Sequence, residues 1–232
     1  MPSGVIEAIA SFLELGGPVV AVLLVLSIFA LALILLKLWQ FLRERVGSHG
    51  RTERALHAWH HQGAGEARAI LEGDRSATGG ALSLAMRLTA AGTAKAVVEE
   101  EVARFALTRL HGLQRGLRAL DAIAQVAPLL GLFGTVLGMI SAFQQLQAAG
   151  NAVDPSALAG GIWVALLTTA AGLGVAMPVS LALTWFETRL ENERVAIETM
   201  TGAVLSQAMA TSTPQPARPL AAVPAGEAAH AH

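Results

Sequence analysis

The chain has 232 residues, of which 53% are hydrophobic and 14% are charged, and its formal net charge is −1 at pH 7. A soluble domain carries about 25% charged residues, so this composition favours a membrane protein that contacts the lipid bilayer. The near-zero net charge gives no indication of a nucleic-acid partner. The absence of cysteine excludes disulfides, thiolate metal ligands and cysteine nucleophiles.

The first apolar segment predicts a transmembrane helix over residues 16–38. Residues 16–36 contain no charged side chain, and about 20 apolar residues span the hydrocarbon core of a bilayer. A cleaved signal peptide begins with basic residues, whereas residues 1–15 contain neither lysine nor arginine. We therefore expect 1–15 to be a short periplasmic segment, followed by a span that the protein retains.

The next region, residues 39–121, predicts several short helices followed by a long one. Helical spacing is found in "RTERALHAWHHQ", "EARAILEG" and "ALSLAMRLTAAG", and "GDRSATGG" is typical of a loop. From 97 to 127 apolar residues recur mostly every three or four positions, interrupted only by Gly112 and Gly116. We favour one continuous helix over 97–127 that runs into the second span; the alternative is an ordinary amphipathic helix that stops short of the membrane.

Three closely spaced histidines in this region, His57, His60 and His61, are candidates for a metal site. His57 and His61 have the i, i+4 spacing that can chelate zinc. Glu53 lies eight residues before His61, about 12 Å along a helix, so one ion cannot easily reach both. We interpret the histidines as a solvated helix face and predict neither a metal nor a cofactor.

Two more long uncharged stretches complete an all-α integral membrane protein with three transmembrane helices and long helical extensions into the cytoplasm. The second and third spans are predicted over 122–147 and 157–186. The periplasmic hairpin 148–156 joins them. A cytoplasmic helix over 187–211 and a disordered Pro/Ala-rich tail over 212–232 follow.

The basic residues predict the orientation of the spans. All sixteen lysines and arginines lie within 37–118 or 189–218. Cytoplasmic loops carry the excess of basic residues. We therefore expect a periplasmic N-terminus, a cytoplasmic region between the first two spans and a cytoplasmic C-terminus.

The second and third spans carry matching stripes of small residues. Each stripe follows the spacing i, i+4, i+7, i+11, with a threonine, Thr135 or Thr169, in second place. Small residues let helix backbones approach closely in lipid. The predicted close-packing residues are Gly131, Gly134, Gly138, Ala165, Gly172 and Ala176. Two interpretations stay open for the threonines: bonding within their own helices, or lining an ion path or a socket for another helix.

Three stretches also resemble the MotA/TolQ/ExbB family of ion-driven motor proteins. They are "GGPVVAVLLVLSIFALALILLKLWQF" (16–41), "APLLGLFGTVLGMISAF" (127–143) and "GIWVALLTTAAGLGVAMPVSL" (161–181). The resemblance implies a homopentameric ring in the bacterial inner membrane. Its central pore would hold helices of an ExbD/TolR-type single-span partner with a titrating carboxylate. Thr135 and Thr169 match the family's polar pore residues, and a TonB-like or other periplasm-spanning protein is a further expected partner.

One position departs from the family pattern. ExbB and TolQ proteins usually have glutamate in a "G-I-x-E-A-L" motif of the third span, where this sequence has Val164. The titrating group must then come from a partner. The departure leaves the coupling ion, proton or sodium, and the ExbB or TolQ subtype open.

The leading functional hypothesis is therefore a ring subunit that couples the proton motive force to energised transport or envelope work. The alternative is a structural membrane scaffold without an ion path. An enzyme is not expected, because intramembrane chemistry is usually marked by ionisable residues and the spans contain none.

Overall fold

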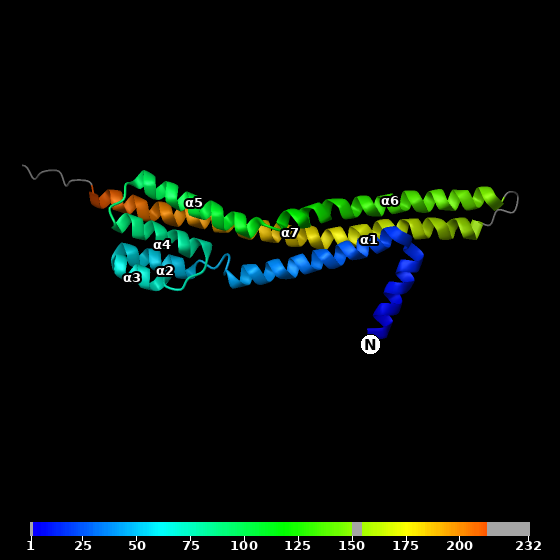
Figure 1. Cartoon of the computed structure of the whole chain (residues 1–232), viewed down its shortest axis with the longest axis horizontal. Helices are drawn as coiled ribbons and strands as arrows, with labels where there is room; N and C mark the ends of the chain where they lie inside the picture. The colour runs from blue at the N-terminus through cyan, green and yellow to red at the C-terminus, as the bar shows by residue number, and fades with distance from the viewer. Residues whose placement is uncertain (1, 150–154, 213–232) are drawn as a thin grey trace, which may run out of the picture.

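The computed structural model describes residues 2–149 and 155–212, with side chains described for 17–148, 155, 156 and 158–206. This part of the chain is helical, without strands, so the all-α prediction is confirmed. Figure 1 shows α6 and α7 lying side by side along the long axis, with the short helices α2 to α4 gathered at one end. The helices are α1 (Pro2–Arg43), α2 (Gly50–His61), α3 (Ala64–Leu71), α4 (Ala77–Ala90), α5 (Lys95–Gln114), α6 (Leu117–Ala149) and α7 (Pro155–Ser212).

Among the described residues, three stretches are long and apolar enough to cross a membrane: Gly17–Arg43, Lys95–Ala148, which includes both α5 and α6, and Leu158–Ser206. They contain almost all of the predicted spans. Their outer faces carry exposed large apolar side chains, which a soluble monomer rarely gathers into such extended patches; these include Val25, Leu36, Leu129, Phe133, Leu166 and Leu181. The three-helix membrane architecture is thus confirmed by length, composition and exposure.

A kink at Gly17 separates the N-terminal part of α1 from the first span. Gly17 has φ 62° and ψ −160°, and Pro18 follows it. A positive φ suits glycine, and proline is tolerated in the first turn of a new helix because its missing N–H has no partner there. Figure 1 shows the first part of α1 leaving the bundle at an angle. The predicted segment 1–15 is helical from Pro2 onward.

The prediction of one continuous helix over 97–127 is wrong. The chain breaks between Gln114 and Leu117, where Gly116 has φ +86°, a conformation that side-chain-bearing residues rarely adopt. The Lys37 Nζ donates to the carbonyl of Leu113 at 3.0 Å. This bond satisfies one of the carbonyls left free at the end of α5 and fixes the break to α1.

The prediction of a loop in "GDRSATGG" is wrong in its second half. Helix α4 begins at Ala77, capped by Ser76, whose Oγ accepts from the Gly79 amide at 2.9 Å. A Cβ on Gly80 would lie 2.7 Å from Cζ of Phe105. A side chain here would require the Phe105 ring of α5 to shift, so Gly80 marks a close contact with α5 rather than a turn.

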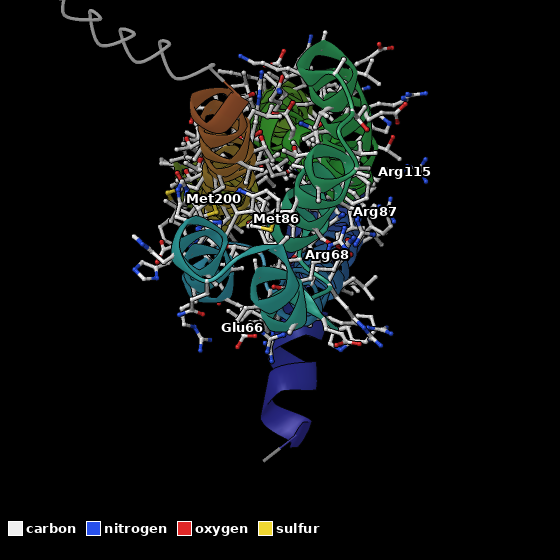
Figure 2. All side chains as sticks on the ribbon, turned by 90° about the vertical axis from the view of Figure 1, so that its left-hand side faces the viewer. Glu66, Arg68, Met86, Arg87, Arg115 and Met200 are labelled. Atoms are coloured by element: carbon white, nitrogen blue, oxygen red, sulfur yellow. The ribbon has the colours of Figure 1, made fainter. Side chains whose placement is uncertain are left out.

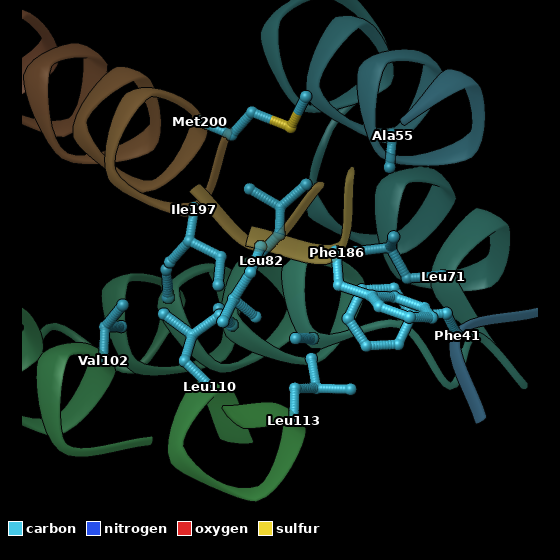
Figure 3. Close-up of a cluster of buried hydrophobic side chains, with 14 of the residues drawn as sticks. Phe41, Ala55, Leu71, Leu82, Val102, Leu110, Leu113, Phe186, Ile197 and Met200 are labelled. Carbon is cyan, nitrogen blue, oxygen red and sulfur yellow. The ribbon is translucent and has the colours of Figure 1, made fainter. Parts of the chain in front are cut away.

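The short helices pack on the second half of α7 around one apolar core. Figure 3 shows buried side chains from α1, α3, α4, α5 and α7 converging on this core. The Phe41 and Phe186 rings meet edge to face, with centroids 5.0 Å apart. Figure 2, an end-on view, shows Met86 and Met200 inside the bundle and Arg68 and Arg87 at its surface. We call α2 to α5 together with the second half of α7 the helical head.

A buried carboxylate joins the head to the end of the first span. Glu193 of α7 is 0% exposed. Its Oε1 accepts from the Thr78 amide at 3.1 Å and from Thr78 Oγ1 at 2.7 Å. Its Oε2 accepts from the Gly47 amide at 2.9 Å and lies 3.2 Å from His49 Nε2. The carboxylate therefore holds the α1–α2 turn and the start of α4 on α7.

We expect Glu193→Ala to loosen these two segments. Each donor left buried without an acceptor costs about 1–3 kcal/mol. Hydrogen–deuterium exchange measured by mass spectrometry should show faster exchange in peptides containing Gly47 and Thr78. The matched control is Glu191→Ala, because Glu191 is exposed two residues away on the same helix. Unchanged exchange in the Glu193 variant would show that the carboxylate does not hold the turn.

Candidate functional site

Helices α6 and α7 touch backbone to backbone. A Cβ on Gly172 would lie 2.6 Å from the Ala127 carbonyl oxygen and 3.0 Å from Cα of Gly131. A Cβ on Gly131 would lie 2.9 Å from the Thr168 carbonyl oxygen. Since the neighbouring atoms belong to the backbone, no side-chain movement could relieve these clashes. Glycine at 131 and 172 is a requirement of this contact.

The contact continues along both helices. A Cβ on Gly138 would lie 2.8 Å from Cβ of Ala165, and one on Gly161 would lie 2.8 Å from Cβ of Ala142. Ala176 is buried in a cluster that also contains Val19, Leu23 and Ala127. We call this contact the α6–α7 interface. In it the two small-residue stripes face one another within a single chain.

Gly134 lies where three helices meet. A Cβ on this residue would lie 2.6 Å from Thr168 Oγ1 and 3.1 Å from Cγ1 of Val19 in α1. The structure thus places Gly131, Gly134 and Gly138 against α7. The partners of the predicted close-packing residues lie within this chain, so the stripes alone give no argument for contacts between subunits.

Thr135 and Thr169 lie about one helical turn apart along the interface. Thr169 stands opposite Gly131, and Thr135 lies between Gly131 and Gly138, which stands opposite Ala165. Thr135 Oγ1 donates to the Leu132 carbonyl of its own helix at 2.6 Å. Thr169 is half-buried, and its Oγ1 is buried without a hydrogen-bond partner in the described part of the chain. The two hydroxyls therefore differ: one is satisfied locally and the other is free.

Thr168 is a residue of this interface that the sequence pattern does not single out. This side chain is 3% exposed, and its Oγ1 contacts the carbonyl oxygens of Ala165 at 2.7 Å and of Gly131 at 3.2 Å. The second contact crosses from α7 to α6. The repeated spacing of the stripes favoured Thr169, and only the register of the two helices shows which of the adjacent hydroxyls faces Gly131.

The open side of α6 next to Thr135 forms a shallow groove. It is lined by Thr135, Val136, Met139, Ile140, Phe143, Gln144 and Gln147. Val136, Ile140 and Phe143 are exposed. The groove gives Thr135 an apolar surface beside it on which another transmembrane helix or lipid can pack.

No ionisable side chain lies in the described parts of the second and third spans between Asp121 and Glu187. Val164, where the resemblance implies a glutamate, is half-buried. The described residues also contain no cluster of three histidine, aspartate or glutamate side chains that could hold a metal. His57 and His61 form an exposed ring pair with centroids 4.5 Å apart. The polar chemistry at the α6–α7 interface is therefore limited to hydroxyls and backbone groups.

Comparison with known proteins gives a consistent result. The model of the MotA/TolQ/ExbB proton channel family matches residues 74–199. A putative biopolymer transport protein ExbB homolog of Methanothermobacter thermautotrophicus is 40% identical over 101 residues, 44% of this chain and 35% of that protein. Biopolymer transport protein exbB1 of Vibrio cholerae is 48% identical over 68 residues, 29% of this chain and 30% of that protein. The matches thus span about a third of the length of these relatives.

We expect Gly172→Ala to destabilise the protein and Gly174→Ala not to. The added methyl at 172 would meet the Ala127 carbonyl, and overpacking costs about 1–3 kcal/mol. Gly174 is the matched control in the same helix, since nothing lies within 4 Å of its Cβ position and alanine favours helix over glycine. Thermal unfolding in mild detergent, followed by the fluorescence of the four tryptophans, measures the difference. Equal melting temperatures for the two variants would disprove the backbone contact.

Proposed function

This chain belongs to the MotA/TolQ/ExbB proton channel family, and on that premise we propose that it is a ring subunit of an ion-driven motor. The motor would couple the proton motive force to energised transport or envelope work. The family match and the ExbB relatives, whose names describe biopolymer transport, support this proposal. The role is mechanical and conductive rather than enzymatic.

The observation that carries the proposal is the free hydroxyl of Thr169. A buried polar group without a hydrogen-bond partner destabilises the folded state by about 1–3 kcal/mol. We therefore expect the Thr169 hydroxyl to bind a group that the single chain does not supply. Thr169 as a whole is only half-buried, so rotation about χ1 can bring Oγ1 toward the accessible part of its site. There it could donate to a carboxylate or to a water molecule in an ion path.

The titrating group in this proposal belongs to a partner. The described parts of spans two and three hold no carboxylate, and hydroxyls do not titrate in the physiological range. An ExbD/TolR-type single-span helix with an aspartate in its span would supply the proton carrier. Thr135 and Thr169 would solvate that carboxylate as it passes, and a ring of five subunits would repeat the pair around the pore.

The proposed orientation has a periplasmic N-terminus and a cytoplasmic head. The distribution of lysine and arginine supports it. Because the chain has no cysteine, single cysteines can report the side of the membrane. In spheroplasts, Ala152→Cys should react with an impermeant maleimide, and Ala69→Cys, exposed on α3, should react only after permeabilisation. The opposite labelling pattern would show that the chain has the reverse orientation in the membrane.

The functional prediction contrasts two adjacent threonines. Thr169→Val removes the free hydroxyl, and loss of a hydrogen bond to a charged group is worth about 1.5–3 kcal/mol, roughly a 10- to 100-fold loss of rate. Thr168→Val removes a bond between helices, worth about 0.6 kcal/mol in membranes, and should leave the rate nearly unchanged. The measurement is gradient-driven proton uptake into proteoliposomes that contain the chain with its co-purified single-span partner.

Three outcomes would contradict the proposal. Equal rates for both variants would remove Thr169 from the ion path. A smaller oligomer for Thr169→Val in native mass spectrometry would show that this residue acts in packing rather than in ion transfer. A wild-type complex that shows no gradient-dependent uptake would favour the structural scaffold instead.

A further inference from the structure

The N-terminal part of α1, residues 2–16, lies across the bundle instead of continuing the line of the first span. Gly17, with φ 62° and ψ −160°, changes the direction of the chain, and Pro18 follows it. Figure 1 and Figure 2, two views at 90° to each other, both show residues 2–16 running across the long axis of the bundle. Because the spans follow this axis, residues 2–16 lie close to the plane of the membrane. We call them the N-terminal helix.

The N-terminal helix leaves the bundle near the level of Trp163 in the third span. A Cβ on Gly134 would lie 3.1 Å from Cγ1 of Val19 and 2.6 Å from Thr168 Oγ1, so Val19 and Thr168 share one level. Gly17 lies two residues beyond Val19, about 3 Å along a helix. Trp163 lies five residues beyond Thr168, about 7.5 Å in the same direction. Gly17 and Trp163 are therefore within roughly one helical turn of each other along the axis.

Two exposed tryptophans of α7 mark the boundaries of the hydrocarbon core. Trp163 is 68% exposed and Trp185 is 43% exposed. They are separated by about 33 Å along the helix, close to the roughly 30 Å thickness of a hydrocarbon core, and tryptophans concentrate at both membrane–water interfaces. Trp185 packs on Phe41 near the head, with ring centroids 6.4 Å apart. Trp163 and the N-terminal helix therefore lie at the boundary opposite the helical head.

The sequence of the N-terminal helix is amphipathic. At 100° per residue, large apolar residues share an arc of about 120°: Val5, Ile6, Ile9, Phe12 and Leu13. The opposite arc consists of small and polar residues: Ser3, Glu7, Ala10, Ser11 and Glu14. Leu15 falls between the two arcs. An apolar stripe of this width is typical of a helix with one face in an apolar environment.

The charge of the N-terminal helix favours the apolar part of the interface over anionic headgroups. The helix contains Glu7 and Glu14 but neither lysine nor arginine, so it lacks the electrostatic attraction to anionic lipid that basic amphipathic helices have. Its apolar arc can instead enter the boundary between headgroups and acyl chains, to a depth of about 5–10 Å. This location is continuous with the lipid-facing side of the first span, where Val22 and Val25 are 48% and 65% exposed.

We propose that the N-terminal helix lies in the membrane–water interface opposite the helical head, with its apolar arc in the lipid. The turn at Gly17 leads the chain from the plane of the interface into the first span. The helix thereby limits how far this span can move along the membrane normal. Because Val19 packs beside Gly134, the anchored end of the first span adjoins the α6–α7 interface. The proposal rests on the three membrane spans and not on the motor function.

The test uses single cysteines, labelled with the fluorophore nitrobenzoxadiazole, in protein reconstituted into phosphatidylcholine vesicles. The chain has no cysteine of its own. A label on Ile9→Cys, in the apolar arc, should be quenched more by a nitroxide near the headgroup end of the acyl chain than by one near the chain terminus. A label on Ser11→Cys, in the opposite arc, should be quenched by iodide supplied on both sides. The control Val25→Cys, about 12 Å beyond Gly17 in the first span, should respond most to the deep nitroxide.

Four results would overturn the proposal. Stronger quenching of the Ile9→Cys label by the deep nitroxide would show that residues 2–16 enter the bilayer core. Quenching of both labels by iodide alone would place the helix in water. An Ile9→Cys label that neither nitroxide nor iodide reaches would show that the apolar arc packs on another protein chain. Adding an anionic lipid should leave the quenching unchanged, and a requirement for that lipid would mean that charge rather than the apolar arc holds the helix.

Discussion

The backbone contact between α6 and α7 is the constraint on which the arrangement of the spans depends. At Gly131 and Gly172 the two helices are too close for any side chain between them. Lipid tails are as apolar as leucine, so helices in a membrane gain their association from close packing and polar contacts rather than from the hydrophobic effect. Because the small residues face inward, the large ones face outward, and the outer faces are left for lipid, a partner or further subunits.

This register also decides what each hydroxyl can do. Thr168 faces α6 and contacts the carbonyl oxygens of Ala165 and Gly131, so it belongs to the packing of the interface. Thr135 is satisfied within its own helix. Thr169, which stands opposite Gly131, keeps a free hydroxyl. Neighbouring positions with the same side chain thus have different roles, set by the side of α7 on which each lies.

The sequence predicts the features that depend on local pattern. Apolar length predicts the three spans, and small residues at helical spacing predict which faces of α6 and α7 pack closely. It does not predict features whose partners are far apart in the chain. The break before Leu117 is stabilised by Lys37, which is 76 residues from its acceptor Leu113. The donors to Glu193 lie 115 and 146 residues away. The residues next to Glu193 in the sequence therefore do not predict that its side chain is buried.

The unbroken length of α7 connects the two ends of the molecule. Its 58 residues extend about 87 Å at 1.5 Å per residue, with the α6–α7 interface near one end and Glu193 farther along. The second span is not continuous with the head in this way, because the turn at Gly116 separates α5 from α6. One continuous helix thus joins the α6–α7 interface to the turn that Glu193 holds, with Pro178 between the two, whereas α5 is separated from α6 by the turn at Gly116. The long helix, rather than the whole bundle, is the element that connects the level of Thr169 with the helical head.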